Sequence, residues 1–293
     1  MSGLVLSQHH VTVGFMTPDI FMMVLFAGLM HALWNALVKG ASDRTITFGL
    51  VSAGHTIPAI IMLPFVPLPD PELLPYIAVS TVIHWGYYYF LNTGYRFGDL
   101  SLVYPVARGV APLLVALPAF IWLDESLPAV AWAGMICISA GILVLAIRRA
   151  GKGPQVPALV MALLTGGTIA LYSLVDGVGI RLAEQALTYI IWLFIAEGFV
   201  ILYIFLPRMK RLRAQTGRQV MIGLAGGILS ALAYALALYA KSKAPLGMVS
   251  ALRETSVVFA AMIGLICFGE RPVRPRLIAA AMVAIGIVML ALA

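Results

Sequence analysis

Residues 99–122 read DLSLVYPVARGVAPLLVALPAFIW, and residues 245–268 read PLGMVSALRETSVVFAAMIGLICF. Both stretches are long and apolar enough to cross a bilayer as a helix, and each carries an arginine, Arg108 or Arg253, away from its ends. A charged side chain near the bilayer centre costs about 2.5–3.5 kcal/mol on insertion scales, so such a residue is usually retained for a structural or functional reason. The two stretches therefore predict membrane helices with a buried charge in each.

The rest of the chain shares this apolar character. Of the 293 residues, 62% are hydrophobic and only 11% are charged, and the mean hydropathy is +1.00. A soluble domain has about 25% charged residues, so this composition predicts a protein that faces lipid. The apolar runs do not alternate with polar residues as the strands of a membrane barrel do, which favours an all-α membrane fold. We expect ten transmembrane helices, at 19–38, 45–66, 74–95, 99–122, 128–148, 156–178, 184–206, 218–241, 245–268 and 273–292.

The net charge of +7 is placed in a way that predicts topology and no nucleic-acid partner. We number the connections between consecutive spans from the N-terminus, so that connection 1 joins the first span to the second. Apart from Arg108 and Arg253, which lie inside spans, the basic residues at or within the odd-numbered connections are Lys39, Arg44, Arg96, Arg148, Arg149, Lys152, Arg208, Lys210, Arg211, Arg213, Arg218, Arg271, Arg274 and Arg276. Only Arg181, Lys241 and Lys243 lie on the other side. The positive-inside rule then puts the odd connections in the cytoplasm and both termini outside.

The chain also repeats itself. A shift of 145 residues superposes Arg108 on Arg253 and Glu125 on Glu270. The expected organisation is an N-terminal tail at 1–18, a first five-helix repeat at 19–150 and a second at 151–293. An odd number of helices makes the second copy enter the membrane upside down. In transporters, inverted repeats place the substrate site near the bilayer midplane where the copies meet.

These motifs make the chain similar to the drug/metabolite transporter superfamily, in its ten-span form with two EamA-type domains. The resemblance rests on residues 101–112 (SLVYPVARGVAP), the turn at 122–126 (WLDES), residues 251–259 (ALRETSVVF), the turn at 268–271 (FGER) and residues 286–290 (GIVML). It covers roughly residues 20–292 and implies a multi-pass exporter of the bacterial inner membrane that resembles exporters of aromatic and other amino acids. Where many relatives have an apolar residue, Glu and Pro, this chain has Arg253-Glu254-Thr255, so no proline break is expected there.

The third expected span is unusually aromatic and polar. His84, Tyr88 and Asn92 share one helical face, and Trp85 and Tyr89 share an adjacent one. A polar ring in mid-span must find a partner or line a wet cavity, so this face favours a cavity wall. Any single ring can instead fill a gap between helices. Aromatic walls suit an apolar or aromatic side chain and can hold an ammonium group by cation–π attraction.

Charged residues inside spans are the other candidates for the site. Arg108 and Arg253 can each bind a substrate carboxylate, because guanidinium donates a planar fork of N–H groups. A structural pair is the alternative, for example Arg253 with Glu197. Tyr104 lies one turn before Arg108 and shares its face. Glu254 and Glu197 can carry a coupling proton, and Glu254 can instead make a helix–helix hydrogen bond.

Four aromatic residues of other spans complete the expected wall, namely His31, Trp34, Tyr172 and Trp192. Glu125 and Glu270 lie in turns and are expected to cap the helix that follows each of them.

The favoured function is export of amino acids of broad specificity, aromatic ones included, by alternating access through a central cavity. The alternative is export of phosphorylated metabolites or cationic drugs. Phosphorylated metabolites would need several Lys or Arg side chains around one cavity. Small multidrug exporters of the superfamily carry an essential Glu in the first span, which this chain lacks after Asp19.

An enzyme is not expected. The chain has no His-Glu-x-x-His, Gly-x-Ser-x-Gly or phosphate-loop motif and no Cys/His metal spacing, so no cofactor and no metal are predicted. The expected partners are an amino acid substrate and the lipid bilayer. A monomer should suffice, because one chain already holds both repeats.

Overall fold

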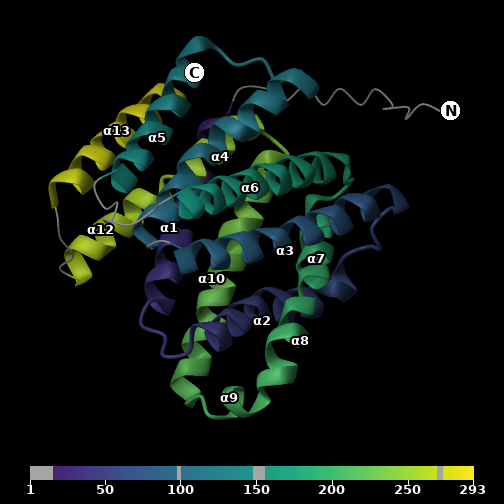
Figure 1. The fold of residues 1–293 in the computed structure, drawn as a ribbon. Helices are drawn as coiled ribbons and strands as arrows, with labels where there is room; N and C mark the ends of the chain where they lie inside the picture. The colour runs from purple at the N-terminus through teal and green to yellow at the C-terminus, as the bar shows by residue number, and fades with distance from the viewer. Residues whose placement is uncertain (1–15, 98–99, 148–155, 269–272) are drawn as a thin grey trace.

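The computed structural model describes residues 16–97, 100–147, 156–268 and 273–293, and within these ranges every regular element is helical. The α-helices are α1 (Pro18–Val38), α2 (Arg44–Met62), α3 (Leu74–Phe97), α4 (Leu100–Trp122), α5 (Ala129–Ile147), α6 (Val156–Leu182), α7 (Ala186–Glu197), α8 (Phe199–Phe205), α9 (Met209–Arg213), α10 (Gly217–Lys241), α11 (Leu246–Arg253), α12 (Ser256–Phe268) and α13 (Val273–Ala291) (Figure 1). The predicted all-α fold is confirmed, and each expected span corresponds to a helix or a broken helix within a few residues.

Nine segments of the described chain are long and apolar enough to cross a membrane. Two of them are broken helices, Ala186–Arg213, which contains α7 and α8, and Leu246–Ile266, which contains α11 and most of α12. The remaining long helix is α3, whose middle carries His84 and a run of tyrosines and is therefore less apolar. The architecture is that of a multi-pass α-helical membrane protein.

The seventh span breaks at Gly198, between α7 and α8. The Gly198 amide donates to Ile195 O at 3.0 Å, so the helix tightens into a short turn there. Thr56 Oγ1 of α2 donates to Phe194 O at 3.0 Å and binds a carbonyl of the last turn before the break. A Cβ on Gly198 would lie 2.8 Å from Thr56 Cγ2, so α2 approaches the break closely because residue 198 has no side chain.

The ninth span breaks at Glu254 and Thr255, although no proline stands there. Thr255 N donates to Leu252 O at 3.0 Å and Val257 N to Glu254 O at 3.0 Å, so tight turns replace the α-helical pattern. Gly28 of α1 packs against this turn, since a Cβ there would lie 2.8 Å from Thr255 Oγ1. Tertiary packing and the buried Glu254 hold the break in place of a proline ring.

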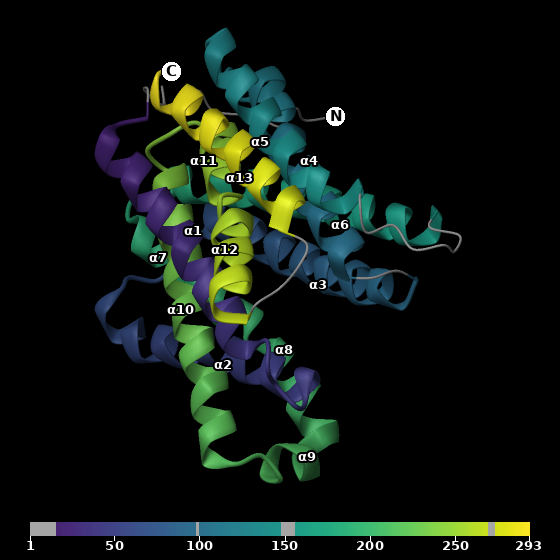
Figure 2. The ribbon, with the colours of Figure 1, turned by 90° about the vertical axis from the view of Figure 1, so that its left-hand side faces the viewer.

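Helix neighbours occur in matching pairs. In the described chain α3 packs on α6 and α10 on α1; α2 packs on α10 and α7 on α3; α4 packs on α5 and α12 on α13. In span numbers, with α6 as span six, α7 in span seven, α10 as span eight and α12 in span nine, the contact between spans three and six corresponds to that between spans eight and one. The other two pairs correspond in the same way when each span is replaced by the one five spans away. The spans five and ten themselves, α5 and α13, lie side by side (Figures 1 and 2).

Two interhelical contacts show how closely the backbones approach. At the crossing of α2 and α10, a Cβ on Gly54 would lie 2.6 Å from both Gly227 Cα and Leu224 O. Between α5 and α13, a Cβ on Gly134 would lie 2.9 Å from Gly286 O. Close packing of small residues holds helices together in lipid, where burial from water provides no force between them.

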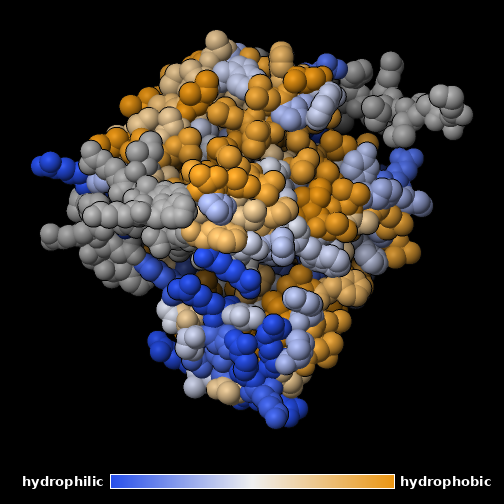
Figure 3. Space-filling model, viewed as in Figure 1, coloured by the Kyte–Doolittle hydropathy of each residue, from blue (hydrophilic) through white to orange (hydrophobic). Residues whose placement is uncertain are grey.

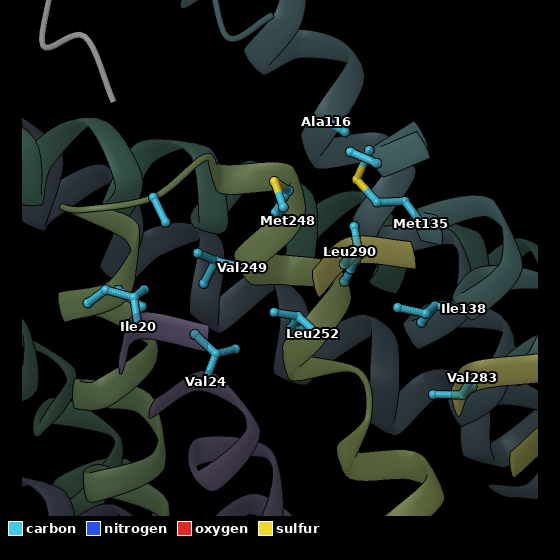
Figure 4. Packing of buried hydrophobic residues seen from close by; sticks show 14 of the residues in the cluster. Ile20, Val24, Ala116, Met135, Ile138, Met248, Val249, Leu252, Val283 and Leu290 are labelled. Atoms are coloured by element: carbon cyan, nitrogen blue, oxygen red, sulfur yellow. The ribbon is translucent and has the colours of Figure 1, made fainter. Parts of the chain in front are cut away.

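One of the two large clusters of buried apolar residues joins α1, α5, α11 and α13 (Figure 4). Met135 and Ile138 come from α5, Val283 and Leu290 from α13, and Leu252 from the end of α11. This cluster anchors α11 just before the break, and so fixes the position at which the following residues, Arg253 and Glu254, leave the helix.

One end of the molecule is polar and basic. Hydrophilic residues gather around α9, whereas apolar residues cover most of the remaining face in the same view (Figure 3). Arg211 of α9 donates from Nε and Nη2 to the two carboxylate oxygens of Asp43, at 2.9 and 2.8 Å. Asp43 also accepts from Ile46 N at 3.2 Å and so caps α2. The Arg211 hydrogen bond holds the pKa of the Asp43 carboxyl below its ordinary value.

Asp43→Asn is expected to cause a small loss of thermal stability, because asparagine retains the cap but loses the ion pair. A carboxyl whose pKa is lowered by folding stabilises the folded state above its ordinary pKa of 3.8, and this contribution disappears as the pH falls through the folded-state pKa. Melting curves in detergent should therefore differ between wild type and variant at pH 7, and the difference should shrink as the pH falls below 3.8. A difference that stays constant on acidification would contradict the ion-pair explanation.

Candidate functional site

A cavity of about 110 Å³ lies between the two halves of the chain, lined by side chains of α1–α4 on one side and α6, α7, α8, α10 and α11 on the other. Of the residues predicted from sequence it is lined by His31, Trp34, His84, Trp85, Tyr88, Arg108, Tyr172 and Arg253. It is also lined by Glu197, which the sequence offered only as an ion-pair partner or proton carrier, and by residues that the sequence reasoning missed, Phe48, Val51, Ser52, His55, Thr56, Tyr87, Val200, Ser230 and Tyr234.

Other predicted site residues lie elsewhere. Tyr89 points outward and is 66% exposed, since it follows Tyr88 by about 100° around the helix. Trp192 does not line the cavity, and its Nε1 donates to Pro67 O at 3.1 Å. Tyr104 lies behind the wall, with its hydroxyl 3.5 Å from His31 Nε2. The side chain of Asn92 lies outside the described residues.

The aromatic wall is built around His84. Its ring stacks on Tyr172 with centroids 4.0 Å apart and meets the edge of Tyr234 at 5.9 Å. Tyr87 contacts Tyr172 edge to face at 6.2 Å. Tyr234 had a detectable signal in the sequence, because it is a polar ring in mid-span within the alanine–leucine run at 231–240.

The contacts of His84 define which nitrogen carries its proton. Nδ1 lies 2.9 Å from Ser80 O, and because a carbonyl only accepts, we place the proton on Nδ1. Glu197 Oε1 lies 3.4 Å from the same nitrogen but makes no hydrogen bond to a described residue. Glu197 lines the cavity, and its Oε1 is a buried acceptor that no donor of the described residues satisfies.

Arg108 pairs with Glu254 across the two halves. Arg108 Nε lies 2.6 Å from Glu254 Oε2, as an ion pair and without the alignment of a hydrogen bond, and Arg108 Nη2 donates to Ser256 Oγ at 3.2 Å. Both charged groups are about 3% exposed. The structural pair offered by the sequence, Arg253 with Glu197, is not the one formed. Arg108 instead connects α4 to the break between α11 and α12.

Arg253 contacts an aromatic ring, whereas Arg108 pairs with a carboxylate. Its guanidinium lies over the ring of Tyr234, with Cζ 4.9 Å from the ring centroid, and borders the cavity. No carboxylate of the described chain lies within ion-pair distance of it. Tyr234 is fixed in turn by its hydroxyl, which donates to the buried Asp176, as does the hydroxyl of Tyr189 at 2.9 Å.

Glu125 has a role that the sequence did not predict. It does not cap the following helix α5; its Oε2 accepts from Leu246 N at 2.8 Å and so caps α11, in the other half of the chain. Its Oε1 accepts from Arg181 Nη2 at 2.6 Å, and Arg181 also donates to Lys241 O and Ala244 O at 2.9 and 3.1 Å. These contacts join three even-numbered connections. Glu270 lies outside the described residues.

No group of three or more His, Cys, Asp or Glu side chains in the described ranges is placed to hold a metal ion. The fold and this cavity define a class, a multi-pass α-helical membrane protein with a polar and aromatic cavity between two sets of helices.

Comparisons with known proteins agree with that class. A sequence profile described as the EamA-like transporter family matches residues 156–292, the second half of the chain. A solved crystal structure, titled only as the structure of a protein, superposes with a TM-score of 0.75 at 18% identity and covers 94% of this chain and 98% of its own. At that identity the likeness shows the fold alone. No curated protein matches in sequence. The family match supports a small-molecule transporter.

Proposed function

We propose that the protein exports amino acids, aromatic ones included, across a bacterial inner membrane. The observation that carries the proposal is the composition of the cavity, in which aromatic rings surround one guanidinium that has no carboxylate partner in the described chain. Such a site binds a carboxylate through the guanidinium and an apolar side chain through the rings.

Alternating access between two inverted five-helix repeats, at 19–150 and 151–293, is the proposed mechanism. The matching helix contacts support the duplication, since they are the contacts that an exchange of halves would produce. The cavity then lies at the interface of the repeats, as in other transporters of this design. One chain supplies both repeats, so a monomer suffices.

The proposed orientation places α9 in the cytoplasm and both termini in the periplasm. Arg208, Lys210, Arg211 and Arg213 lie in or next to α9, and the positive-inside rule supports this assignment. The contacts of Glu125 and Arg181 then close the periplasmic end of the protein in this conformation.

Phosphorylated metabolites fit this cavity less well. Lys241 is 1% exposed, does not line the cavity, and donates from Nζ to Ser173 O at 3.3 Å. Among the described residues that line the cavity, Arg253 is the guanidinium without a carboxylate partner, and a phosphate monoester with up to two negative charges would need more than one such cation. Lipophilic cations meet the same guanidinium as a repulsive charge.

Counterflow in proteoliposomes tests the proposal. Proteoliposomes that contain wild-type protein and are preloaded with unlabelled leucine or phenylalanine should accumulate the labelled amino acid from outside. Neither a sugar phosphate nor a lipophilic cation should compete with this uptake. Tyr88→Ala should lower the exchange rate at least tenfold, because Tyr88 lines the cavity and contacts Phe48 at 4.7 Å.

Tyr89→Ala is the matched control, since Tyr89 follows on the same helix and points away from the cavity. Folded wild-type protein that exchanges no amino acid would refute the proposal. Strong competition by a sugar phosphate would favour phosphorylated substrates instead.

A further inference from the structure

The two intramembrane arginines differ in what neutralises them. Arg108 has Glu254 at 2.6 Å and Ser256 at 3.2 Å, so its charge is balanced within the protein. An ion pair between buried groups leaves no net charge for a ligand. Arg108 therefore has little to offer a substrate carboxylate, although its side chain borders the cavity.

Arg253 has no carboxylate of the described residues within ion-pair distance. Its described partner is the ring of Tyr234 at 4.9 Å, which contributes a weaker attraction than a carboxylate does. The position at the carboxyl end of α11 favours a cation, because the helix dipole is negative there. It also directs the guanidinium into the cavity, where an anionic group of a ligand can form the missing ion pair.

Glu197 presents the opposite charge in the same cavity. It is the last residue of α7, where the negative end of the helix dipole disfavours a carboxylate. His84 lies 3.4 Å away, yet Oε1 of Glu197 accepts no hydrogen bond from a described residue. A cationic N–H donor from a ligand would satisfy this oxygen and offset the unfavourable dipole.

The charge balance defines the ligand class. Arg108 and Glu254 form an ion pair, so Arg253 of α11 and Glu197 of α7 are the oppositely charged residues of the described cavity lining that have no ion pair with each other or with this pair. A zwitterion matches both. A simple cation would match only Glu197, and a simple anion only Arg253.

Cavity size adds a limit on the side chain. The volume of about 110 Å³ is below the roughly 150 Å³ of an engineered protein cavity that holds benzene. Because this volume must also hold the carboxylate and ammonium groups, a small amino acid fits this conformation best, and a larger aliphatic or aromatic one requires the cavity to widen.

We propose that Arg253 binds the carboxylate and Glu197 the ammonium group of an α-amino acid, whereas Arg108 positions α4 against the α11–α12 break and does not touch the substrate. This assignment rests on the proposed function and names the two charged ligands of its site.

Binding of three isosteric probes to the purified full-length protein in detergent tests the assignment. L-Leucine carries both charges, L-leucinamide lacks the carboxylate, and 2-hydroxy-4-methylpentanoate lacks the ammonium group. By calorimetric titration, wild type should bind leucine at least tenfold more tightly than either analogue. Arg253→Gln should abolish the preference over leucinamide and retain the preference over the hydroxy acid, and Glu197→Gln should do the reverse.

The double variant Arg108→Gln/Glu254→Gln is the control, and it should keep both preferences. Amino acid counterflow by wild type, together with unchanged preferences in Arg253→Gln and Glu197→Gln, would overturn the assignment and leave the proposed function standing. Loss of the carboxylate preference in the Arg108 double variant alone would transfer the carboxylate role to Arg108. A wild type that neither binds nor exchanges amino acids would overturn both proposals.

Discussion

Glu254→Gln is expected to destabilise the protein by about 3–5 kcal/mol, because it leaves the Arg108 guanidinium buried without a counter-charge. Arg108 is 3% exposed, and Glu254 is its ion-pair partner at 2.6 Å. The substitution changes little in size, so the loss reports charge and not packing. Unfolding in mixed micelles with increasing SDS, followed by circular dichroism, measures the free-energy difference.

The double variant Arg108→Gln/Glu254→Gln separates the pair from its parts. Removal of both charges should recover most of the lost stability, since a buried ion pair contributes little beyond its own desolvation cost. If the double variant were as unstable as Glu254→Gln, the buried charge would not be the cause. If Glu254→Gln weakens binding and the double variant does not, the binding defect of the single variant results from its lower stability.

Gly54→Leu is expected to cost about 3 kcal/mol or more and to lower the yield of monodisperse protein. Its Cβ would lie 2.6 Å from Gly227 Cα and from Leu224 O, and these are backbone atoms that cannot move aside without separating α2 from α10. Both helices line the cavity, so their separation should also reduce counterflow. Size-exclusion profiles and SDS unfolding measure the two effects.

Gly167→Ala is the matched control for a glycine within a helix. No atom lies within 4 Å of a Cβ built at Gly167, and alanine has the higher helix propensity by about 1 kcal/mol. Its stability should equal or slightly exceed that of wild type. Equal losses in Gly54→Leu and Gly167→Ala would show that the close crossing is not what limits substitution.

The helices were readable from the sequence because lipid imposes a simple rule. Every spanning segment must satisfy its own backbone hydrogen bonds, so length and apolar character alone locate it. Even α3 was found, because its aromatic rings are largely apolar and its polar residues are confined to its centre. The break at Glu254 was not readable, because it depends on Gly28 and on the buried partner of Glu254, which lie far away in sequence.

The candidate site was predicted only in part. Helical spacing placed His84 and Tyr88 on one side of α3, and both line the cavity as described, whereas Tyr89 points away from it. Tyr234 and His55 were missed, because a single polar residue in an apolar span indicates that it needs a partner but not which neighbouring helix or cavity it faces. The contact of Trp192 with the 66–73 connection likewise could not be predicted from spacing, since its partner is Pro67 O.

Composition and length alone identify an all-helical membrane protein, the positions of its helices and two arginines within them, because these properties are decided locally. Folding, in contrast, neutralises Arg108 with Glu254, whereas among the described residues Arg253 has no carboxylate within ion-pair distance and Glu197 Oε1 accepts no hydrogen bond. The two arginines look equivalent along the chain. Their difference arises from which carboxylate the packing of α4 against α11 and α12 brings within ion-pair distance, and such a distance is a property of the folded molecule.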